Sequence, residues 1–386
     1  MKIDINPSKS ISDFCFLYKK KFLENGWPSS KLEHWKMTPL NKFIKGYTDL
    51  SVKSDYNITS SLKNEVLNEI KSENLNLLQT NYFKSNEMSR VVFSNFDNAF
   101  EITLPENFSS KEVIDISNFV ENGIWSSSII IIKVGKNVNA NLQFDFTLSS
   151  NSLCTPLLTF DIREGANVAF GLNITNKAKS LIKSNFVGMM DANLKSNSKL
   201  DMVLTQQGVN LSRSDININL NGDYSSFNLT GIYFGREKQH KDITACVNHN
   251  AENTSSKQII RGILDDSSVG VYQGGIKVAP QAQKTDGQQM SRALLLSKLA
   301  ESNSKPELEI FADDVSCAHG ATIGELNKEH FFYLLSRGIP YMKARDILIK
   351  AYLSEILDDI DNKYLSNQLE TAINFWLNKL VEKVAA

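Results

Sequence analysis

The first part of the chain carries a hydrophobic stripe at helical spacing. Apolar side chains recur three or four residues apart at Ile11, Phe14, Cys15, Tyr18 and Phe22. This spacing predicts an α-helix, with Ser10 and Asp13 as its capping box and Gly26 and Pro28 as its stop. Cys15 lies on the stripe, so we expect it to be a core residue rather than a reactive one.

From about residue 90 the pattern changes from helical to alternating, after a second helix predicted over residues 61–79. Ile216, Ile218 and Leu220 alternate with asparagines, which is the pattern of a half-buried strand. Clusters of Asn, Ser, Gly and Asp separate these segments and supply turn chemistry. Similar short segments recur at residues 157–162, 167–172, 200–204, 227–234 and 258–264.

A β region of this length fits a sandwich, a barrel or a parallel β-solenoid. The strands start at irregular intervals of about 10 to 17 residues, and no regular series of Asn-Gly or Asp-Gly hairpin turns links them. This favours a solenoid, although periodicity alone leaves the choice open. We predict a β core over residues 89–326, between helical regions at residues 1–88 and 327–386.

The last part of the chain is helical again. Asn327 is the expected N-cap of a helix that ends before Gly338 and Pro340, and two further amphipathic stretches follow. So few helices cannot bury their apolar faces among themselves, so we expect them to pack on the β core or on a partner. His330, near the start of the first helix, is expected to be a surface or packing residue.

Composition and charge exclude several classes of protein. The 386 residues are 41% hydrophobic and 22% charged, and the net charge of −1 offers no electrostatic surface for nucleic acid or anionic membranes. No run of 18 apolar residues occurs, and the N-terminus lacks the apolar segment of a signal peptide. The expected location is therefore the cytoplasm.

Cysteine spacing excludes the local metal motifs. The four cysteines lie far apart and form no CxxC pair, so neither a zinc knuckle nor a self-contained iron–sulfur motif is present. His240 and His249 bracket Cys246, but at spacings that match no zinc signature. The glycine-rich residues 270–275 lack the context of a nucleotide loop and are expected to form a bend in a strand.

Residues 311–327, FADDVSCAHGATIGELN, concentrate the polar chemistry of the chain. If a strand continues past Asp313 and Asp314, Val315, Cys317 and His319 share one face of it, and Cys317 and His319 can approach one metal ion or small cluster. We expect Gly320 and Gly324 to end that strand. A Cys–His nucleophile pair and a plain turn at the two aspartates are the alternatives, and the local pattern does not separate the three.

The surrounding sequence resembles the SufB/SufD family of iron–sulfur cluster assembly proteins. The resemblance lies in AQKTDGQQ, LLLS, KPELEI, ADDVSCAHGATIG and FYLLSRGI, in this order within residues 274–338. KLEHWKMTPL is similar to the N-terminal signature of the family, although Met37 replaces the usual aromatic residue there. Ala318 replaces the serine common between the cysteine and the histidine. The intact CxHGAT element resembles the SufD branch of the family.

The resemblance implies a right-handed parallel β-helix core flanked by N-terminal and C-terminal helical regions. It implies a SufB–SufC₂–SufD scaffold, in which His319, and less directly Cys317, meet a transient iron–sulfur cluster shared with SufB. Asp313, Asp314, Gly320 and Gly324 complete the motif.

The resemblance also implies which subunit of the complex hydrolyses ATP and where it binds. SufC is implied to hydrolyse ATP and to dock on the C-terminal helices, since this chain contains no GxxxxGK[ST] sequence. The complex is implied to bind reduced flavin at a site that the sequence does not locate, and a homodimer in isolation is left open. The chain itself is then a scaffold subunit and not an enzyme.

Two other functions remain as alternatives. A β-helix can host a carbohydrate-active enzyme, with Asp313 and Asp314 as acid and base, although adjacent residues on a strand point to opposite faces. The chain can also be a purely structural partner, in which Cys317 and His319 do no chemistry.

Overall fold

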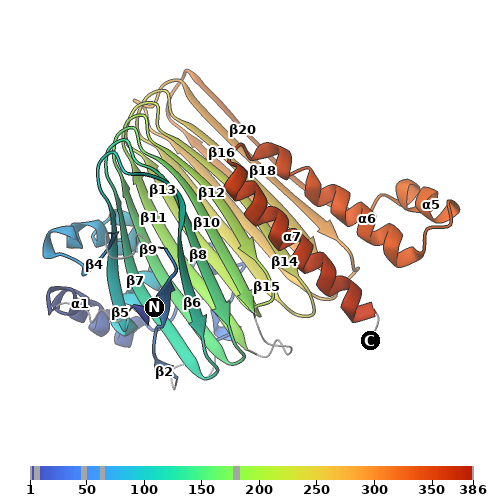
Figure 1. Ribbon diagram of the computed structural model, residues 1–386, viewed down its shortest axis with the longest axis horizontal. Helices are drawn as coiled ribbons and strands as arrows, with labels where there is room; N and C mark the ends of the chain where they lie inside the picture. The colour runs from blue at the N-terminus through green and yellow to red at the C-terminus, as the bar shows by residue number, and fades with distance from the viewer. Residues whose placement is uncertain (1, 4–8, 45–49, 61–65, 177–182, 385–386) are drawn as a thin grey trace.

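The computed structural model is a parallel β-solenoid with helical regions at both ends of the chain (Figure 1). It describes residues 2–3, 9–44, 50–60, 66–176 and 183–384. Consecutive long strands alternate between two sheets, so each coil of the chain adds one strand to each sheet. The predicted mainly β fold with helical ends is confirmed, and the solenoid is the β architecture present.

We call the two sheets A and B. Sheet A contains, in spatial order, β1 (Lys2–Ile3), β3 (Tyr56–Ile58), β6 (Ser109–Val120), β8 (Asn139–Leu148), β10 (Asn167–Asn176), β12 (Lys199–Gln206), β14 (Ser226–Gly235), β16 (Ser255–Leu264), β18 (Thr285–Leu295) and β20 (Val315–Glu325). Sheet B contains β4 (Leu67–Asn68), β5 (Asn98–Leu104), β7 (Ile124–Val134), β9 (Ser152–Ile162), β11 (Ser184–Leu194), β13 (Leu211–Leu220), β15 (His240–His249), β17 (Val269–Val278) and β19 (Glu301–Ile310), with β2 (Ser51–Val52) beside β7.

The core lies between the two sheets and is built from columns of inward side chains. Phe170 of β10, for example, stands opposite Leu142 of β8 and Met202 of β12, and all three are buried. Because side chains alternate along each strand and the strands pair in register, apolar residues stack from coil to coil. The alternating pattern of the sequence therefore becomes one continuous apolar interior.

Asparagines close many of the turns between the sheets. Asn107, Asn137, Asn197 and Asn253 adopt left-handed backbone angles, with φ between 55° and 61°. Asparagine tolerates this conformation better than other residues with a side chain. The Asn137 side-chain amide also donates to Asn107 Oδ1 at 3.2 Å, which links two successive turns. The turn chemistry predicted from the sequence is confirmed.

The N-terminal region lies against the outer face of sheet B. Helix α1 ends at Asn25, and Gly26 follows with φ +62°, as the sequence predicts. The helix begins at Lys9, so Ser10 lies inside it and the predicted N-cap position is wrong. The elements are α1 (Lys9–Asn25), the 3₁₀ helices η1 (Glu33–Trp35), η2 (Leu40–Lys42) and η4 (Ser72–Leu78), α3 (Asn81–Ser85) and α4 (Glu87–Asn95).

The helix predicted over residues 61–79 is wrong as one continuous element. Val66 is helical and Ser72–Leu78 form a 3₁₀ helix, but a short strand lies between them; residues 61–65 lie outside the described chain. Leu67 and Asn68 form β4, which pairs antiparallel with β5, and a 3₁₀ helix follows. Val66 and Leu78 are fully buried. Tertiary burial against the first coil therefore overrides the local helical pattern.

The two ends of the solenoid differ. At the N-terminal end the short antiparallel strands β3 and β4 cover the edges of β6 and β5. At the C-terminal end, no strand of the described chain pairs with the outer edge of β19 or β20. Only the N-terminal end of the solenoid is therefore closed. The unpaired edges at the C-terminal end can pair with a strand of another molecule.

The C-terminal helices are α5 (Lys328–Ser336), α6 (Tyr341–Ser354) and α7 (Lys363–Val384), with a 3₁₀ turn, η5 (Leu357–Asp359), before α7. Asn327 is the N-cap of α5, as predicted, since its side chain accepts two backbone N–H groups. α7 lies along the outer face of sheet A, where Trp376 stacks on Phe234 at 4.6 Å (Figure 1). Of the helices expected to pack on the β core or on a partner, α6 and α7 pack on sheet A. None of the described helices has the length and apolar character needed to span a membrane.

Candidate functional site

The polar stretch of the sequence forms the last turn and the last strand of the solenoid. Residues 311–314 cross from β19 in sheet B to β20 in sheet A. Asp313 and Asp314 are exposed in this crossing. The previous coil fixes the Asp314 backbone, because Gln283 Oε1 accepts its N–H at 2.9 Å and the Lys284 N–H donates to its carbonyl at 2.6 Å. The two aspartates therefore sit in a turn.

Gly320 and Gly324 lie inside β20 and do not end it, so that prediction is wrong. β20 stays paired with β18 as far as Glu325, and the chain then reaches the Asn327 N-cap. Pairing with the neighbouring strand keeps the backbone extended despite the two glycines.

Cys317 and His319 lie on the inward face of β20, at the open end of the solenoid. They stand opposite Gly287 and Gln289 of β18, and Gln289 is buried between the sheets. Cys317 also packs against the apolar cluster around Ile276. Side chains on one face of a strand lie about 6.5 to 7 Å apart, so the thiol and the imidazole can reach one metal ion or small cluster.

The Cys317 thiol occupies space that a glycine leaves open. A Cβ atom on Gly287 would lie 3.3 Å from Cys317 Sγ, tighter than ordinary contact. Burial raises the pKa of the Cys317 thiol and the Asp286 carboxylate adds to this, while a hydrogen bond with the Gly287 backbone opposes it. The thiol thus keeps its proton until a metal ion or a base removes it.

The His319 side chain is exposed, whereas Gln289 beside it is only 2% exposed. The difference arises because β20 covers β18, and no further strand of the described chain covers β20. An imidazole enclosed within its own subunit would have excluded a site shared with a second polypeptide. The His319 imidazole is not enclosed.

The ligand set at this end is incomplete. In the described part of the chain, no three His, Cys, Asp or Glu side chains are grouped so as to hold a metal ion. An iron–sulfur cluster normally has four protein ligands, most of them thiolates. One thiol and one imidazole at the open end would fill at most two of these positions.

The other histidines predicted to be weak candidates do not converge with a cysteine. Cys246 lies on the outer face of β15, whereas His249 faces the interior and contacts Ser256 Oγ at 2.8 Å. His240 is bonded instead to Thr38 Oγ1 at 2.9 Å. Burial lowers the pKa of both histidines to about 4. Residues 270–275 lie within the regular strand β17 and form no nucleotide loop.

The N-terminal KLEHWKMTPL segment contacts a buried charged cluster on sheet B that sequence reasoning missed. Arg213 is fully buried, with its guanidinium 4.1 Å from the centre of the Trp35 ring and 2.6 Å from Asp242 Oδ2. The Thr38 hydroxyl donates to the same carboxylate. Burial lowers the pKa of Arg213, but attraction to Asp242 and Asp215 outweighs it and raises that pKa. The cluster fastens the N-terminal segment to sheet B.

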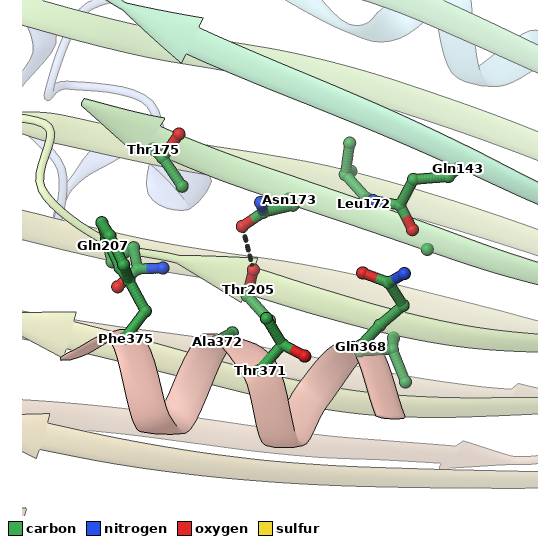
Figure 2. A pocket seen from close by; sticks show the side chains of 12 residues that line it. Gln143, Leu172, Asn173, Thr175, Thr205, Gln207, Gln368, Thr371, Ala372 and Phe375 are labelled. Carbon is green, nitrogen blue, oxygen red and sulfur yellow. Dashed lines mark hydrogen bonds between the residues drawn. The ribbon is translucent and has the colours of Figure 1, made fainter. Parts of the chain in front are cut away.

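A pocket between α7 and the outer face of sheet A is a second candidate (Figure 2). Its lining is neutral, with amides such as Gln143 and Gln368, hydroxyls such as Thr205 and the ring of Phe375. Tyr364 Oη already donates to Gln143 Oε1 at 2.8 Å. No thiol, imidazole or carboxylate lines this pocket, so it lacks the ligands that iron requires.

The fold and the site together define a parallel β-solenoid whose uncovered end presents a thiol and an imidazole on the inward face of its last strand. A family model described as SUF system FeS cluster assembly, SufBD core domain, matches residues 119–352. The chain belongs to this family of iron–sulfur cluster assembly proteins.

Curated relatives carry names that agree with the family. The iron–sulfur cluster assembly protein SufD of Escherichia coli is 37% identical over 157 residues, which are 41% of this chain and 37% of that protein. A SufBD family protein of Synechocystis is 35% identical over 179 residues, 46% of this chain and 39% of that protein. A SufBD family protein of Mycobacterium leprae is 24% identical over 357 residues, 90% of this chain and 89% of that protein. The matches to the first two thus span well under half of those proteins.

Proposed function

We propose that this chain is a SufD-type scaffold subunit that assembles iron–sulfur clusters at its contact with a SufB-type partner. The observation that carries the proposal is the position of His319, which is exposed on the inward face of an uncovered terminal strand. The cluster is cargo, built at the contact and then passed on. Residues 89–326 would form the β core with the assembly motif, between helical regions at 1–88 and 327–386.

The open edges of β19 and β20 support the contact with a second β-solenoid. Apolar side chains that face the interior elsewhere are partly exposed here, with Ile310 at 39% and Ile323 at 48%. A partner strand on each edge would bury these side chains and satisfy the free backbone groups. A related solenoid has strands at the same spacing, which makes a SufB-type subunit the fitting partner.

The ligands would be divided between the two subunits. His319 would bind iron through one ring nitrogen, and Cys317 would add a thiolate once it loses its proton. The remaining thiolates would come from the SufB-type partner. Asp313 and Asp314 would take no part in the chemistry, because they lie in the exposed crossing turn.

ATP hydrolysis is placed on a SufC-type partner that docks on the C-terminal helices. α6 and α7 use Ile349, Leu353 and Leu369 to pack on sheet A. α5, in contrast, has no buried residue and lies beyond α6, away from the strands (Figure 1). We therefore place the docking surface on α5 and the start of α6, within the C-terminal region 327–386. A reduced flavin in the complex has no assigned site on this chain.

We predict that Phe332→Asp in α5 weakens binding of the SufC-type partner by at least tenfold without lowering stability. The Phe332 ring is 73% exposed, so a charge there costs the fold little, whereas an aromatic anchor at an interface often contributes about 2 kcal/mol or more. Calorimetric titration and thermal unfolding measure the two effects. The matched control is Phe16→Asp in α1, where the ring is 72% exposed. Unchanged binding by the Phe332 variant would place docking elsewhere.

The proposed function is tested by co-expressing a tagged form of this chain with SufB-type and SufC-type subunits. Anaerobic purification on the tag should recover all three chains, with iron, acid-labile sulfide and the absorption bands of a cluster. Omission of the SufB-type subunit should remove the cluster. Recovery of the tagged chain alone, or of a complex without iron and sulfide, would overturn the proposal.

A further inference from the structure

A buried polar layer lies directly beneath the open coil. Gln258 of β16 and Gln289 of β18 stand side by side in the inward column, and the Tyr272 hydroxyl lies 3.2 Å and 3.3 Å from their two Oε1 atoms. All three side chains are at most 2% exposed. Buried amides are costly unless hydrogen-bonded, and most of the solenoid interior is apolar.

The position of Gln289 within this layer is tightly restricted. Its Nε2 atom donates to the Glu307 carbonyl at 3.2 Å, across the core from sheet A to sheet B. A Cβ atom on Gly274 would lie 2.2 Å from Gln289 Oε1 and 2.3 Å from Tyr272 Oη. Glycine is therefore the one residue that leaves room for this pair, and the amide is held from two sides.

The layer has one donor too few. A tyrosine hydroxyl carries one hydrogen, so Tyr272 can satisfy the Oε1 atom of Gln258 or of Gln289, but not both at once. The next side chain in the inward column beyond Gln289 is His319 of β20. Neighbouring strands lie about 4.8 Å apart, so the His319 imidazole can approach the Gln289 amide, although the two side chains share no hydrogen bond in this structure.

The opposite wall of the open coil is polar as well. Ser304 of β19 stands next to Tyr272 of β17 in the register of sheet B. Its Oγ atom is buried and has no hydrogen-bond partner within the described residues. The terminal coil therefore presents polar groups from both sheets to whatever occupies it.

We propose that Gln289 is a positioning residue for His319, with its Oε1 atom accepting the hydrogen of one imidazole nitrogen. This inference rests on the proposed function and adds a residue to it. A histidine that binds a metal usually donates its second ring N–H to a carbonyl or carboxylate, which fixes the tautomer and the ring orientation. Gln289, braced by Tyr272, would turn the free nitrogen of His319 toward the cluster.

The test uses the co-expressed three-subunit complex and two variants of this chain. Gln289→Met keeps the length of the side chain and removes the acceptor, and Tyr272→Phe removes only the hydroxyl that braces it. Gln288→Met is the matched control, because Gln288 is the adjacent glutamine on the exposed face of β18. Cluster content per complex and the nitrogen coupling of the reduced cluster, measured by electron spin-echo modulation, are the two readouts.

We expect Gln289→Met to lower cluster content by about tenfold or more, the range found for partners of metal-bound histidines. The residual clusters should show a weakened or heterogeneous nitrogen coupling, which a purely structural role would not alter. Tyr272→Phe should act in the same direction with a smaller loss, and Gln288→Met should match wild type. If a thermal scan shows that Gln289→Met does not fold, the cluster content and nitrogen coupling of Tyr272→Phe decide the test.

Wild-type content and coupling in both variants would overturn the inference, and so would a loss of content with an unchanged coupling in the residual clusters. Comparison with His319→Ala separates this failure from failure of the proposed function. If His319→Ala loses its clusters while Gln289→Met keeps them, only the role of Gln289 is wrong. If His319→Ala keeps its clusters, the proposed function fails and the role of Gln289 fails with it.

Discussion

Replacing His319 with alanine is expected to lower cluster content of the co-expressed complex at least tenfold while all three subunits still assemble. In the proposed site, His319 and Cys317 are the two candidate ligands that the described residues place on the inward face of β20, so the loss of His319 removes half of this chain's contribution. Loss of a hydrogen-bond partner of a ligand already costs about 10-fold to 100-fold in many metal sites. Loss of the ligand itself should cost no less.

Because His319 is exposed, its replacement should change cluster binding without unfolding the chain. A substitution at an exposed strand position changes the free energy of unfolding by about 0.5 kcal/mol or less, so the fold and its partners should be retained. Ser316→Ala is the matched control, because Ser316 is exposed on the opposite face of the same strand. Cys317→Ser should give a smaller loss, since this thiol is half-buried and its pKa is raised by burial. Wild-type cluster content in His319→Ala would refute the assignment.

Replacing Arg213 with methionine is expected to lower the free energy of unfolding by about 3 to 5 kcal/mol. The substitution retains most of the apolar volume but leaves the Asp242 carboxylate, which is 0% exposed, without its cation. A second carboxylate, Asp215 Oδ2, lies 3.3 Å from the same guanidinium. The Trp35 ring also loses its cation–π contact. The expected loss is thus a large part of the total free energy of unfolding of a domain.

Urea unfolding measures this effect, and Lys136→Met is its control. Lys136 forms an ion pair with Glu164 at 3.3 Å, with both side chains about half exposed, and such surface pairs contribute about 0 to 1 kcal/mol. Limited proteolysis should also show earlier cleavage between residues 27 and 44 in the Arg213 variant, because Trp35 and Thr38 lose their anchor. Equal unfolding midpoints for the two variants would show that the buried cluster does not fasten the N-terminal segment.

Local features of the sequence predicted most of the elements. Alternation around Ile216 and Ile218 identified a strand, the asparagine clusters identified turns, and Asn327 and Gly338 marked the ends of α5. Each of these signals acts within a few residues, through side-chain alternation, left-handed turn conformations or helix capping. The shared face of Cys317 and His319 follows from the same two-residue period.

Two predictions of secondary structure were wrong because strands distant in the sequence determine the local conformation. One continuous helix was predicted over residues 61–79, yet Leu67 and Asn68 form a strand, because β5 offers β4 an edge to pair with. Gly320 was expected to end a strand, yet β18 holds it in place.

The sequence by itself determined a β core between helical regions, the chemistry of the residue types in its last motif and, through long ordered motifs, the family. Tertiary structure alone decided that one end of the solenoid is closed and the other open, which is why His319 is exposed. It also decided that Gln289, which contacts Tyr272, is the strand neighbour of His319, and that the Arg213 guanidinium is buried against the Trp35 ring. The physical reason is the register of parallel strands, which places residues about thirty positions apart in direct contact and leaves no trace in a local pattern.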